Sequence, residues 1–276
     1  MDTYKPSVAQ IVEFLTELYH EGMSYSALNT ARSALSSIVS TQDNLPCGEH
    51  PLVKRLMKGF FNARPSLPRY NYTWSPEQVL VFLDEWSPPE KLTLRQLTLK
   101  VVTLIALITG QRCQTIHCMD LNSMQKTNDR FRFIIESMIK TTKPGSLQPV
   151  LILPMFTHDD KRCIYKFLVE YLNRTANLRL NHSKLFISFY KPHEAVHKET
   201  ISRWIRTVLS LAKIDLDVFK PHSTRSASAS AASRSSVQLP TIMKAATWKT
   251  DSVFRIFYNK PLDTEEQFAL AILNKN

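Results

Sequence analysis

The chain has 276 residues, a formal net charge of +11 and a sequence pI near 9.5. A hydrophobic share of 43% with 21% charged residues is typical of a soluble globular protein, and the most apolar run, residues 101–108, is too short to span a bilayer. The excess of positive charge indicates a polyanionic partner such as nucleic acid, while a total of five glycines disfavours a glycine-rich nucleotide loop.

Residues 7–64 predict a small helical unit. Apolar residues recur at helical spacing over residues 8–18, and Gly22 ends that helix. Ser24 or Ser26 caps a second helix to about residue 39, and a third follows over residues 51–62. The apolar side of the third helix is expected to contain Leu52, Leu56 and Phe60.

The third helix also carries a cluster of cations formed by Lys54, Arg55 and Lys58. Such a cluster is either a solvated face or a set of phosphate contacts, and both interpretations stay open. Arg32 on the second helix and Lys143 further along the chain are additional candidates for contact with DNA.

A linker is predicted where two prolines interrupt residues 64–72. The predicted organisation is a helical domain over residues 1–66, a linker over 67–74 and a second domain over 75–276. Helices are expected at 76–86, after the Ser75 cap, and at 92–109, where Gly110 ends the helix and Arg112 follows.

The second domain combines a hairpin with further helices. Residues 131–135 and 150–153 are β-branched or aromatic runs that flank the turn tripeptide at 143–145, and a third short strand is expected at 185–188. Helices are predicted over residues 159–174, 198–212, 223–236, 240–248 and 251–258. The Ala/Ser run at 226–236 is either a flexible linker or, as we favour, a tightly packed helix. The fold class is therefore mainly α with a small antiparallel sheet.

The chemistry concentrates in residues 220–258. His222 and Arg225 are three residues apart and lie on one face of a helix, so both can donate hydrogen bonds to a single anion. An arginine fork binds two phosphate oxygens at once. Tyr258 offers an oxygen nucleophile that needs activation, because a free tyrosine has a pKa of about 10.

These residues carry a resemblance to a known family. His222-Ser-Thr-Arg225, then Trp248 and Tyr258, together with Thr109-Gly110-Gln111-Arg112, resemble the motifs of the tyrosine recombinase (phage integrase) family. The strings TGQRCQT, IKTTKPG, PHSTRSASAS and WKTDSVFRIFYNKP more narrowly resemble recombinases of eukaryotic DIRS, Ngaro and Crypton mobile elements. The resemblance spans most of the chain from about residue 74 onward.

The resemblance implies a role for each matching residue. Arg112 and Arg225 correspond to the arginines that clamp the non-bridging phosphate oxygens, and Tyr258 to the nucleophile. Alone, each arginine is as easily a surface residue, and Tyr258 with Phe254 as easily an aromatic core pair.

Three further positions complete the implied site. Lys140 corresponds to the general acid, with Lys143 as the alternative. His222 is expected to donate to the phosphate or to help move the tyrosine proton; otherwise it is a capping or core histidine. Trp248 stands where many relatives have histidine, and its indole N–H can position the phosphate but cannot shuttle a proton.

Two departures from the family pattern affect the assignment. Tyr258 lies ten residues after Trp248, whereas nine is the usual spacing and would place Phe257 there; phenylalanine has no hydroxyl, so Tyr258 stays the candidate. Thr115 occupies the position three after the first arginine, where the family commonly has an acid, which puts the orientation of Arg112 in doubt.

The family resemblance implies a helical core-binding (SAM-like) domain followed by a catalytic domain that closes around double-stranded DNA. It implies strand cleavage and transfer through a 3′-phosphotyrosine, without cofactor, metal or ATP, by a homo-tetramer on DNA that is monomeric when free. The amphipathic residues 263–273 would dock on a neighbouring subunit or on their own core. Four cysteines without a CxxC pair favour an intracellular setting, with the nucleus expected in a eukaryote, and no membrane partner.

Two alternatives remain. The first is a domesticated, catalytically silent DNA-binding protein that keeps the fold. The second is a zinc metalloprotease, because His193-Glu194-Ala195-Val196-His197 matches HExxH, in which two histidines one helical turn apart bind zinc. No third ligand is apparent beyond generic acids such as Glu199, which makes the second alternative remote.

Overall fold

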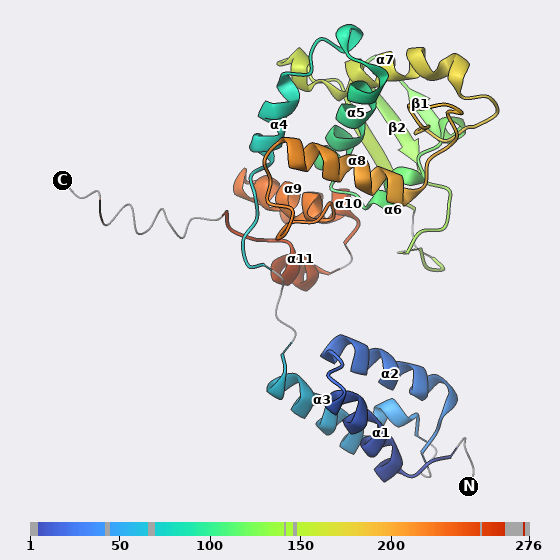
Figure 1. The fold of residues 1–276 in the computed structure, drawn as a ribbon, viewed down its shortest axis with the longest axis vertical. Helices are drawn as coiled ribbons and strands as arrows, with labels where there is room; N and C mark the ends of the chain where they lie inside the picture. The colour runs from blue at the N-terminus through green and yellow to red at the C-terminus, as the bar shows by residue number, and fades with distance from the viewer. Residues whose placement is uncertain are drawn as a thin grey trace. The chain divides into compact units, whose positions relative to one another are not determined.

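The computed structural model describes residues 5–41, 45–65, 70–140, 142–145, 148–248, 250–262 and 273. The chain divides into two compact units, Met1–Arg69 and Tyr70–Asn276 (Figure 1). Each unit has its own hydrophobic core. Among the described helices, none is both long and apolar enough to cross a bilayer.

The smaller unit packs helices α1 (Val8–His20), α2 (Tyr25–Ile38) and α3 (Pro51–Ala63) around one core, with a 3₁₀ turn at Cys47–Glu49. Ser24, not Ser26, caps α2 by accepting a hydrogen bond from the Ala27 N–H. The prediction for the apolar side of α3 was wrong at Leu52, which is 55% exposed. The side of α3 that faces the core follows the spacing i, i+4, i+7, and its buried residues are Val53, Met57 and Phe60.

The larger unit is built around helix α5 (Leu94–Thr109), whose residues are buried on nearly every side. A capping box between Thr93 and Gln96 begins α5, and Gly110 ends it in the left-handed conformation, with φ of +57°. The helices around it are α4 (Pro76–Asp84), α6 (Cys113–His117), α7 (Ile164–Thr175), α8 (Lys198–Leu211), α9 (Ser223–Arg234), α10 (Leu239–Ala246) and α11 (Asp251–Phe257).

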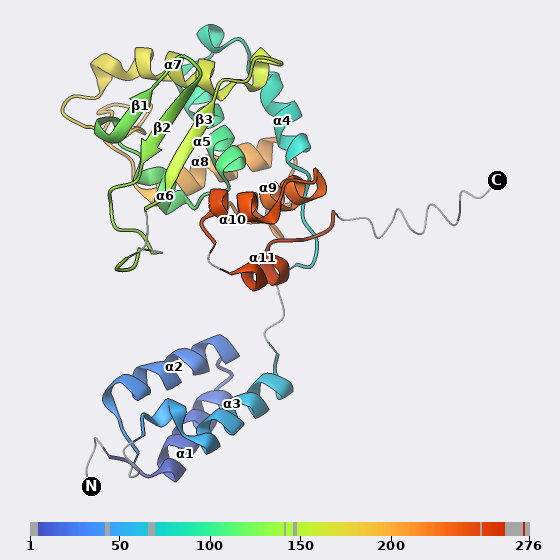
Figure 2. The same ribbon diagram turned by 180° about the vertical axis from the view of Figure 1, so that it is seen from behind.

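A three-stranded antiparallel sheet, in the order β1 (Met124–Lys126), β2 (Arg130–Ile134) and β3 (Val150–Pro154), covers part of α5 and α7 (Figure 2). Phe131 pairs with Leu153 and Phe133 with Leu151, and all four are buried, while the alternate residues of β3 are exposed. The predicted hairpin and the predicted fold class are confirmed.

The predicted third strand was wrong. Residues 185–188 form no strand; Ile187 makes only a single bridge to Ala195. The third strand is β1, whose sequence Met124-Gln125-Lys126 lacks β-branched and aromatic residues and is partly or fully exposed. A strand at the sheet edge with one polar face needs few apolar residues, so the sequence pattern gave no sign of it.

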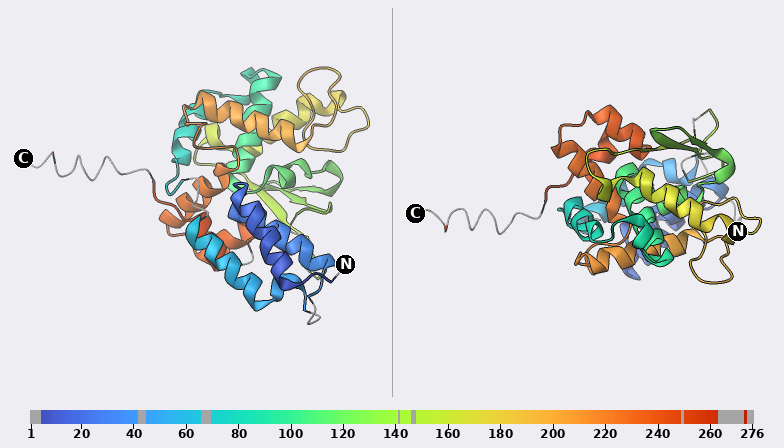
Figure 3. Two further views of the ribbon diagram at one scale, coloured as in Figure 1. Left: turned by 60° about the horizontal axis from the view of Figure 1, so that its bottom comes forward. Right: turned by 90° about the horizontal axis from the view of Figure 1, so that it is seen from above.

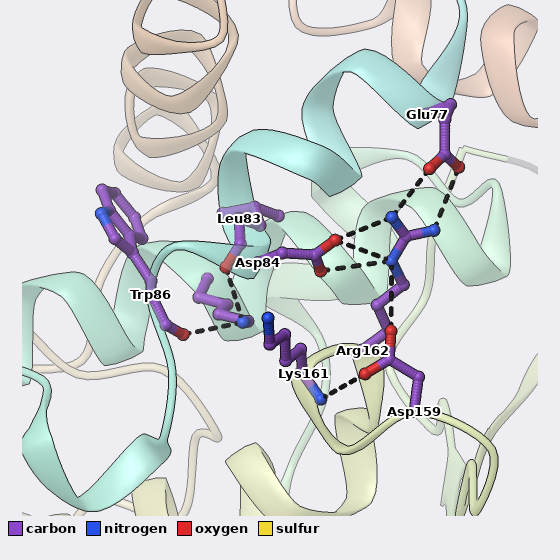
Figure 4. A network of polar contacts seen from close by, with 8 residues as sticks. Glu77, Leu83, Asp84, Trp86, Asp159, Lys161 and Arg162 are labelled. Atoms are coloured by element: carbon purple, nitrogen blue, oxygen red, sulfur yellow. Dashed lines mark hydrogen bonds and ion pairs between the residues drawn. The ribbon is translucent and has the colours of Figure 1, made fainter.

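Two buried or half-buried cations fasten α4 to the rest of the unit (Figure 4). Arg162 binds Asp84 and Glu77 on α4, each with an N···O distance of 2.7 Å. The ammonium of Lys100, fully buried in α5, donates hydrogen bonds to the carbonyls of Leu83, in the last turn of α4, and Trp86, just after it, at 2.7 and 2.8 Å. Lys100 thereby adds donors to backbone carbonyls where α4 ends and the chain turns.

The C-terminal helices of the larger unit lie together beside the end of α5. In both views of Figure 3 the orange-red segments that correspond to α9, α10 and α11 are neighbours. Residues 70–74, the last part of the predicted linker, pack within the same unit. The Trp74 indole N–H donates to the hydroxyl of Ser223, at 2.8 Å, in the first turn of α9. The amphipathic stretch 263–273 lies outside the described residues except for its last position.

Candidate active site

Arg225 is the buried centre of the site. It lies in the first turn of α9 and is 0% exposed. Its Nη1 donates to the Gly110 carbonyl at 2.7 Å and its Nη2 to the Ala246 carbonyl at 3.0 Å, so one guanidinium joins the end of α5 to the end of α10. Its Nε is buried and has no hydrogen-bond partner among the described residues.

Arg112 reaches the same place from a different part of the chain. It follows the left-handed Gly110 and stands in extended conformation at the N-terminus of α6. The adjacent Gln111 anchors this corner by donating to the Ala245 carbonyl at 2.6 Å. Burial lowers the pKa of Arg225 to about 10, helped by the positive charge of Arg112, while Tyr258 acts in the opposite direction. The two arginines are therefore close enough to repel each other.

His222 and Tyr258 face each other at the open side of this cluster. The Nε2 of His222 lies 3.3 Å from the Tyr258 hydroxyl, and their ring centres are 6.3 Å apart. Desolvation by the surrounding protein, together with the positive charges of Arg225, Arg112 and Lys140, lowers the pKa of His222 to about 4. Although His222 itself is exposed at the surface, its neighbours thus favour the neutral ring near pH 7.

Trp248 completes an aromatic and cationic stack. Its ring centre is 4.3 Å from that of Tyr258, and the guanidinium carbon of Arg225 lies 5.2 Å from the Trp248 ring and 5.6 Å from the Tyr258 ring. The indole Nε1 of Trp248 is buried without a hydrogen-bond partner among the described residues. A buried donor without a partner is costly, and this donor lies in the same cluster as the unpartnered Nε of Arg225.

The positive charge of Lys140 acts on His222. Lys140 is exposed in the segment between β2 and β3, and its backbone N–H donates to Gln114 of α6 at 3.3 Å. It is one of the cations that lower the pKa of His222, together with Arg225 and Arg112. Thr115, which stands where the family commonly has an acid, is 1% exposed within α6.

The predicted DNA contacts of the smaller unit differ in their positions and partners. Arg32, Lys54 and Lys58 line one surface hollow between α2 and α3, together with Tyr25 and Phe61. Arg32 also has a structural task, since its Nη1 donates to the Gly48 carbonyl at 2.8 Å. Lys54 pairs with Glu49. Arg55 is exposed on α3 but does not line the hollow.

The HExxH stretch lacks the geometry of a zinc site. Residues 193–197 are not helical; His193 has φ of +61°, and His197 precedes the first turn of α8. Glu194 pairs with the Nε2 of His182 at 2.6 Å. Within the described ranges, no group of three or more His, Cys, Asp or Glu side chains is placed to hold a metal ion. The two histidines therefore do not lie one helical turn apart, as this motif requires.

Sequence reasoning missed the groups that hold the site in place. The carbonyls of Gly110 and Ala246 orient Arg225, and the hydroxyl of Ser230 on α9 binds the backbone on either side of Asn259. Backbone carbonyls have no sequence signature. Ser230 stands in a run of serines and alanines in which nothing distinguishes it.

Comparison with known proteins identifies the fold. Three solved structures illustrate the likeness in fold. The XerH site-specific recombinase bound to its difH substrate, before cleavage, has a TM-score of 0.61 at 14% identity, over 98% of this chain and 72% of that chain. The Tn1549 transposon integrase with transposon right end DNA has 0.61 at 14%, over 99% and 86%. A lambda integrase dimer bound to a COC′ core site has 0.54 at 15%, over 96% and 83%.

The fold is thus that of a tyrosine recombinase catalytic domain, mainly helical with a small antiparallel sheet. The model of the phage integrase family matches residues 75–265, so the chain belongs to that family. A search of the curated proteins found no match.

Proposed function

We propose that this chain is a site-specific DNA recombinase that cleaves and rejoins strands through a 3′-phosphotyrosine. The observation that carries the proposal is the approach of Arg112, Arg225, His222 and Tyr258 to one place, from three separate parts of the chain. Membership of the phage integrase family supports the same conclusion.

The proposed role of the arginines is to hold the scissile phosphate. A guanidinium has five N–H donors, and Arg225 uses only two of them on carbonyls. Its Nε and the Nε1 of Trp248 are the buried donors that would bind non-bridging oxygens. Arg112, which is half-buried and makes no ion pair with the residues that the structure describes, would supply the second charge.

Cleavage would proceed by in-line displacement. The Tyr258 oxygen forms a bond to phosphorus while the bond from phosphorus to the 5′-oxygen breaks. His222, favoured in its neutral form, accepts the phenol proton through Nε2, and Lys140 gives a proton to the departing 5′-oxygen. Attack by a different 5′-hydroxyl reverses the step. The phosphotyrosine conserves the bond energy, so the chemistry consumes no ATP, and the proposed residues supply the charge.

The proposal extends to organisation and setting. Residues 1–66 would form the core-binding domain, 67–74 the linker and 75–276 the catalytic domain. The residues proposed to contact DNA are Arg32, Lys54, Arg55, Lys58 and Lys143.

Recombination between two duplexes takes four strand cleavages, so the active species would be a homo-tetramer on DNA. The motif wording supports descent from a eukaryotic mobile element of the DIRS, Ngaro or Crypton type, and action in the nucleus.

The test is a covalent trap. Nicked duplexes made from the sequences that flank the gene lose a short 5′ fragment after cleavage, so religation fails and the protein stays attached. The wild type is expected to form an adduct that survives denaturation, and Tyr258→Phe to form none. Tyr190→Phe, at an exposed tyrosine outside the site, serves as the matched control and should match the wild type. DNA binding without any adduct would instead indicate the silent DNA-binding protein.

A further inference from the structure

A single serine links the helix that carries Arg225 to the backbone of Tyr258. Ser230 lies on α9, about one and a half turns beyond Arg225, and is 0% exposed. Its hydroxyl donates to the Tyr258 carbonyl at 2.5 Å and accepts the Lys260 N–H at 2.9 Å. One hydroxyl therefore satisfies both ends of the turn that follows α11.

The turn needs such a partner because the helix stops there. Helix α11 ends at Phe257, and the N–H groups of Tyr258 and Asn259 both donate to the Phe254 carbonyl. The carbonyl of Tyr258 thus faces away from a helix that no longer continues, and a buried carbonyl without a donor is costly. Arg234, also on α9, donates to the Lys260 carbonyl at 3.2 Å.

The far side of the same turn is tied down as well. The ammonium of Lys260 donates to the Tyr70 carbonyl, and the Thr73 N–H donates to the Pro261 carbonyl at 2.8 Å. Lys260 is only 8% exposed. The segment that carries Tyr258 is therefore held between α9 and residues 70–73. Among these contacts, the bond from Ser230 is the one made to the backbone of Tyr258 itself.

We propose that Ser230 is a positioning residue for Tyr258, which rests on the function proposed above. Through its backbone contacts it places the phenol opposite the phosphate that Arg225 binds from the same helix. Ser230 touches neither the phosphate nor a group that transfers a proton. Its loss shifts the nucleophile and leaves the charge of the site unchanged.

The chain offers a matched control on the same helix. Ser228 is also a serine of α9 with a buried hydroxyl, but that hydroxyl has no hydrogen-bond partner among the described residues. Removing an unpartnered buried hydroxyl is neutral or stabilising. Ser228→Ala and Ser230→Ala thus make the same chemical change on one helix and differ in whether a bond to the turn is lost.

The experiment measures single-turnover adduct formation on the nicked duplex, DNA affinity and thermal stability for the wild type, Ser230→Ala, Ser228→Ala and Ser230→Thr. We expect Ser230→Ala to slow adduct formation by about 10- to 100-fold, since a displacement of about 1 Å costs up to this factor. DNA affinity should stay within about twofold. The ratio of the wild-type rate of adduct formation to that of Ser230→Ala should be the same at each pH, because no ionising group is lost. Ser228→Ala should react at the wild-type rate, and Ser230→Thr, which keeps the hydroxyl, should recover part of the rate.

The outcomes separate this proposal from the function on which it rests. A wild-type rate in Ser230→Ala, or an equal loss of rate in Ser228→Ala, overturns the positioning role while recombination stands. A Ser230→Thr rate no better than that of Ser230→Ala, in a protein that binds DNA normally, also contradicts it. If the wild type binds DNA and forms no adduct, the proposed function fails, and the positioning role fails with it.

Discussion

Arg225 donates one hydrogen bond to the Gly110 carbonyl, two residues before Arg112. The second arginine of the site is thereby attached to the backbone that presents the first. Both residues of this bond belong to the larger unit. The two arginines are consequently linked through the backbone of the fold, although they come from distant parts of the sequence.

The first prediction follows from the unequal bonding of the two arginines. Arg225→Ala should abolish adduct formation and also lower the free energy of unfolding by about 2–5 kcal/mol. The Gly110 carbonyl loses the guanidinium donor, the Ala246 carbonyl keeps only the Thr247 hydroxyl, and a large buried side chain is deleted. Arg112→Ala should lower the cleavage rate by at least about 100-fold and change the free energy of unfolding by less than about 0.5 kcal/mol. Urea unfolding and the covalent trap measure the two effects. Equal destabilisation by both substitutions would contradict the assignment.

The second prediction concerns the proton donor. Lys140→Ala should slow cleavage of ordinary DNA by about 100- to 10,000-fold. A substrate in which sulfur replaces the bridging 5′-oxygen should restore the rate, because a thiolate leaves without a proton. Lys143→Ala, a matched change three residues further along the same segment, removes a proposed DNA contact and weakens binding, but with saturating protein it should cleave bound DNA at nearly the wild-type rate. If the substrate with the bridging sulfur restored the rate of Lys143→Ala and not that of Lys140→Ala, the general acid would be Lys143.

The third prediction concerns the ionisation of His222. In the free protein its imidazole should titrate near pH 4, well below the ordinary value of about 6.5. The surrounding protein desolvates the ring, and three neighbouring cations disfavour its positive charge. Between these two pH values the unfolded chain binds a proton that the folded protein does not. The contribution of His222 to stability is thus lost as the pH falls through this window. NMR titration gives the midpoint directly, with His222→Asn to assign the signal. A midpoint at or above 6.5 would contradict the cluster of positive charge.

The fourth prediction tests the support beneath the site. Lys100→Met leaves the Trp86 carbonyl without the ammonium that donates to it and the Leu83 carbonyl with the Trp86 N–H alone, and should destabilise the protein by about 1–3 kcal/mol. Burial lowers the pKa of Lys100 to about 8, so between pH 8 and about 10.5 the unfolded chain binds the extra proton. Stability from this residue therefore rises with pH in that range. Urea unfolding of both proteins across the range measures it, and identical curves would refute the role of Lys100.

Much of the fold could be predicted from the sequence because its signals are local. Ser75 and Pro76 begin α4, Gly110 ends α5, and the apolar residues of β3 alternate between exposed and buried. The prediction failed where the deciding interaction was remote. Residues 185–188 have the composition of a strand but no strand beside them, and β1 has a partner without the composition.

The site divides in the same way. Residues that would act on the phosphate, such as Arg112 and Tyr258, belong to motifs that a sequence can display. The groups that place them do not. Every residue type has a backbone carbonyl, so nothing in the sequence marks that of Gly110 as the partner of Arg225. Ser230 differs from Ser228 only in the backbone groups that the fold places within reach of its hydroxyl.

The measurement that tests the account most directly is the mass of the peptide that contains Tyr258 after the wild type has reacted with a nicked duplex. We predict that this peptide carries the 3′-phosphate of the cleaved strand on the tyrosine oxygen. A phosphate on any other residue, or an unmodified Tyr258 in protein that binds the duplex, would contradict the account.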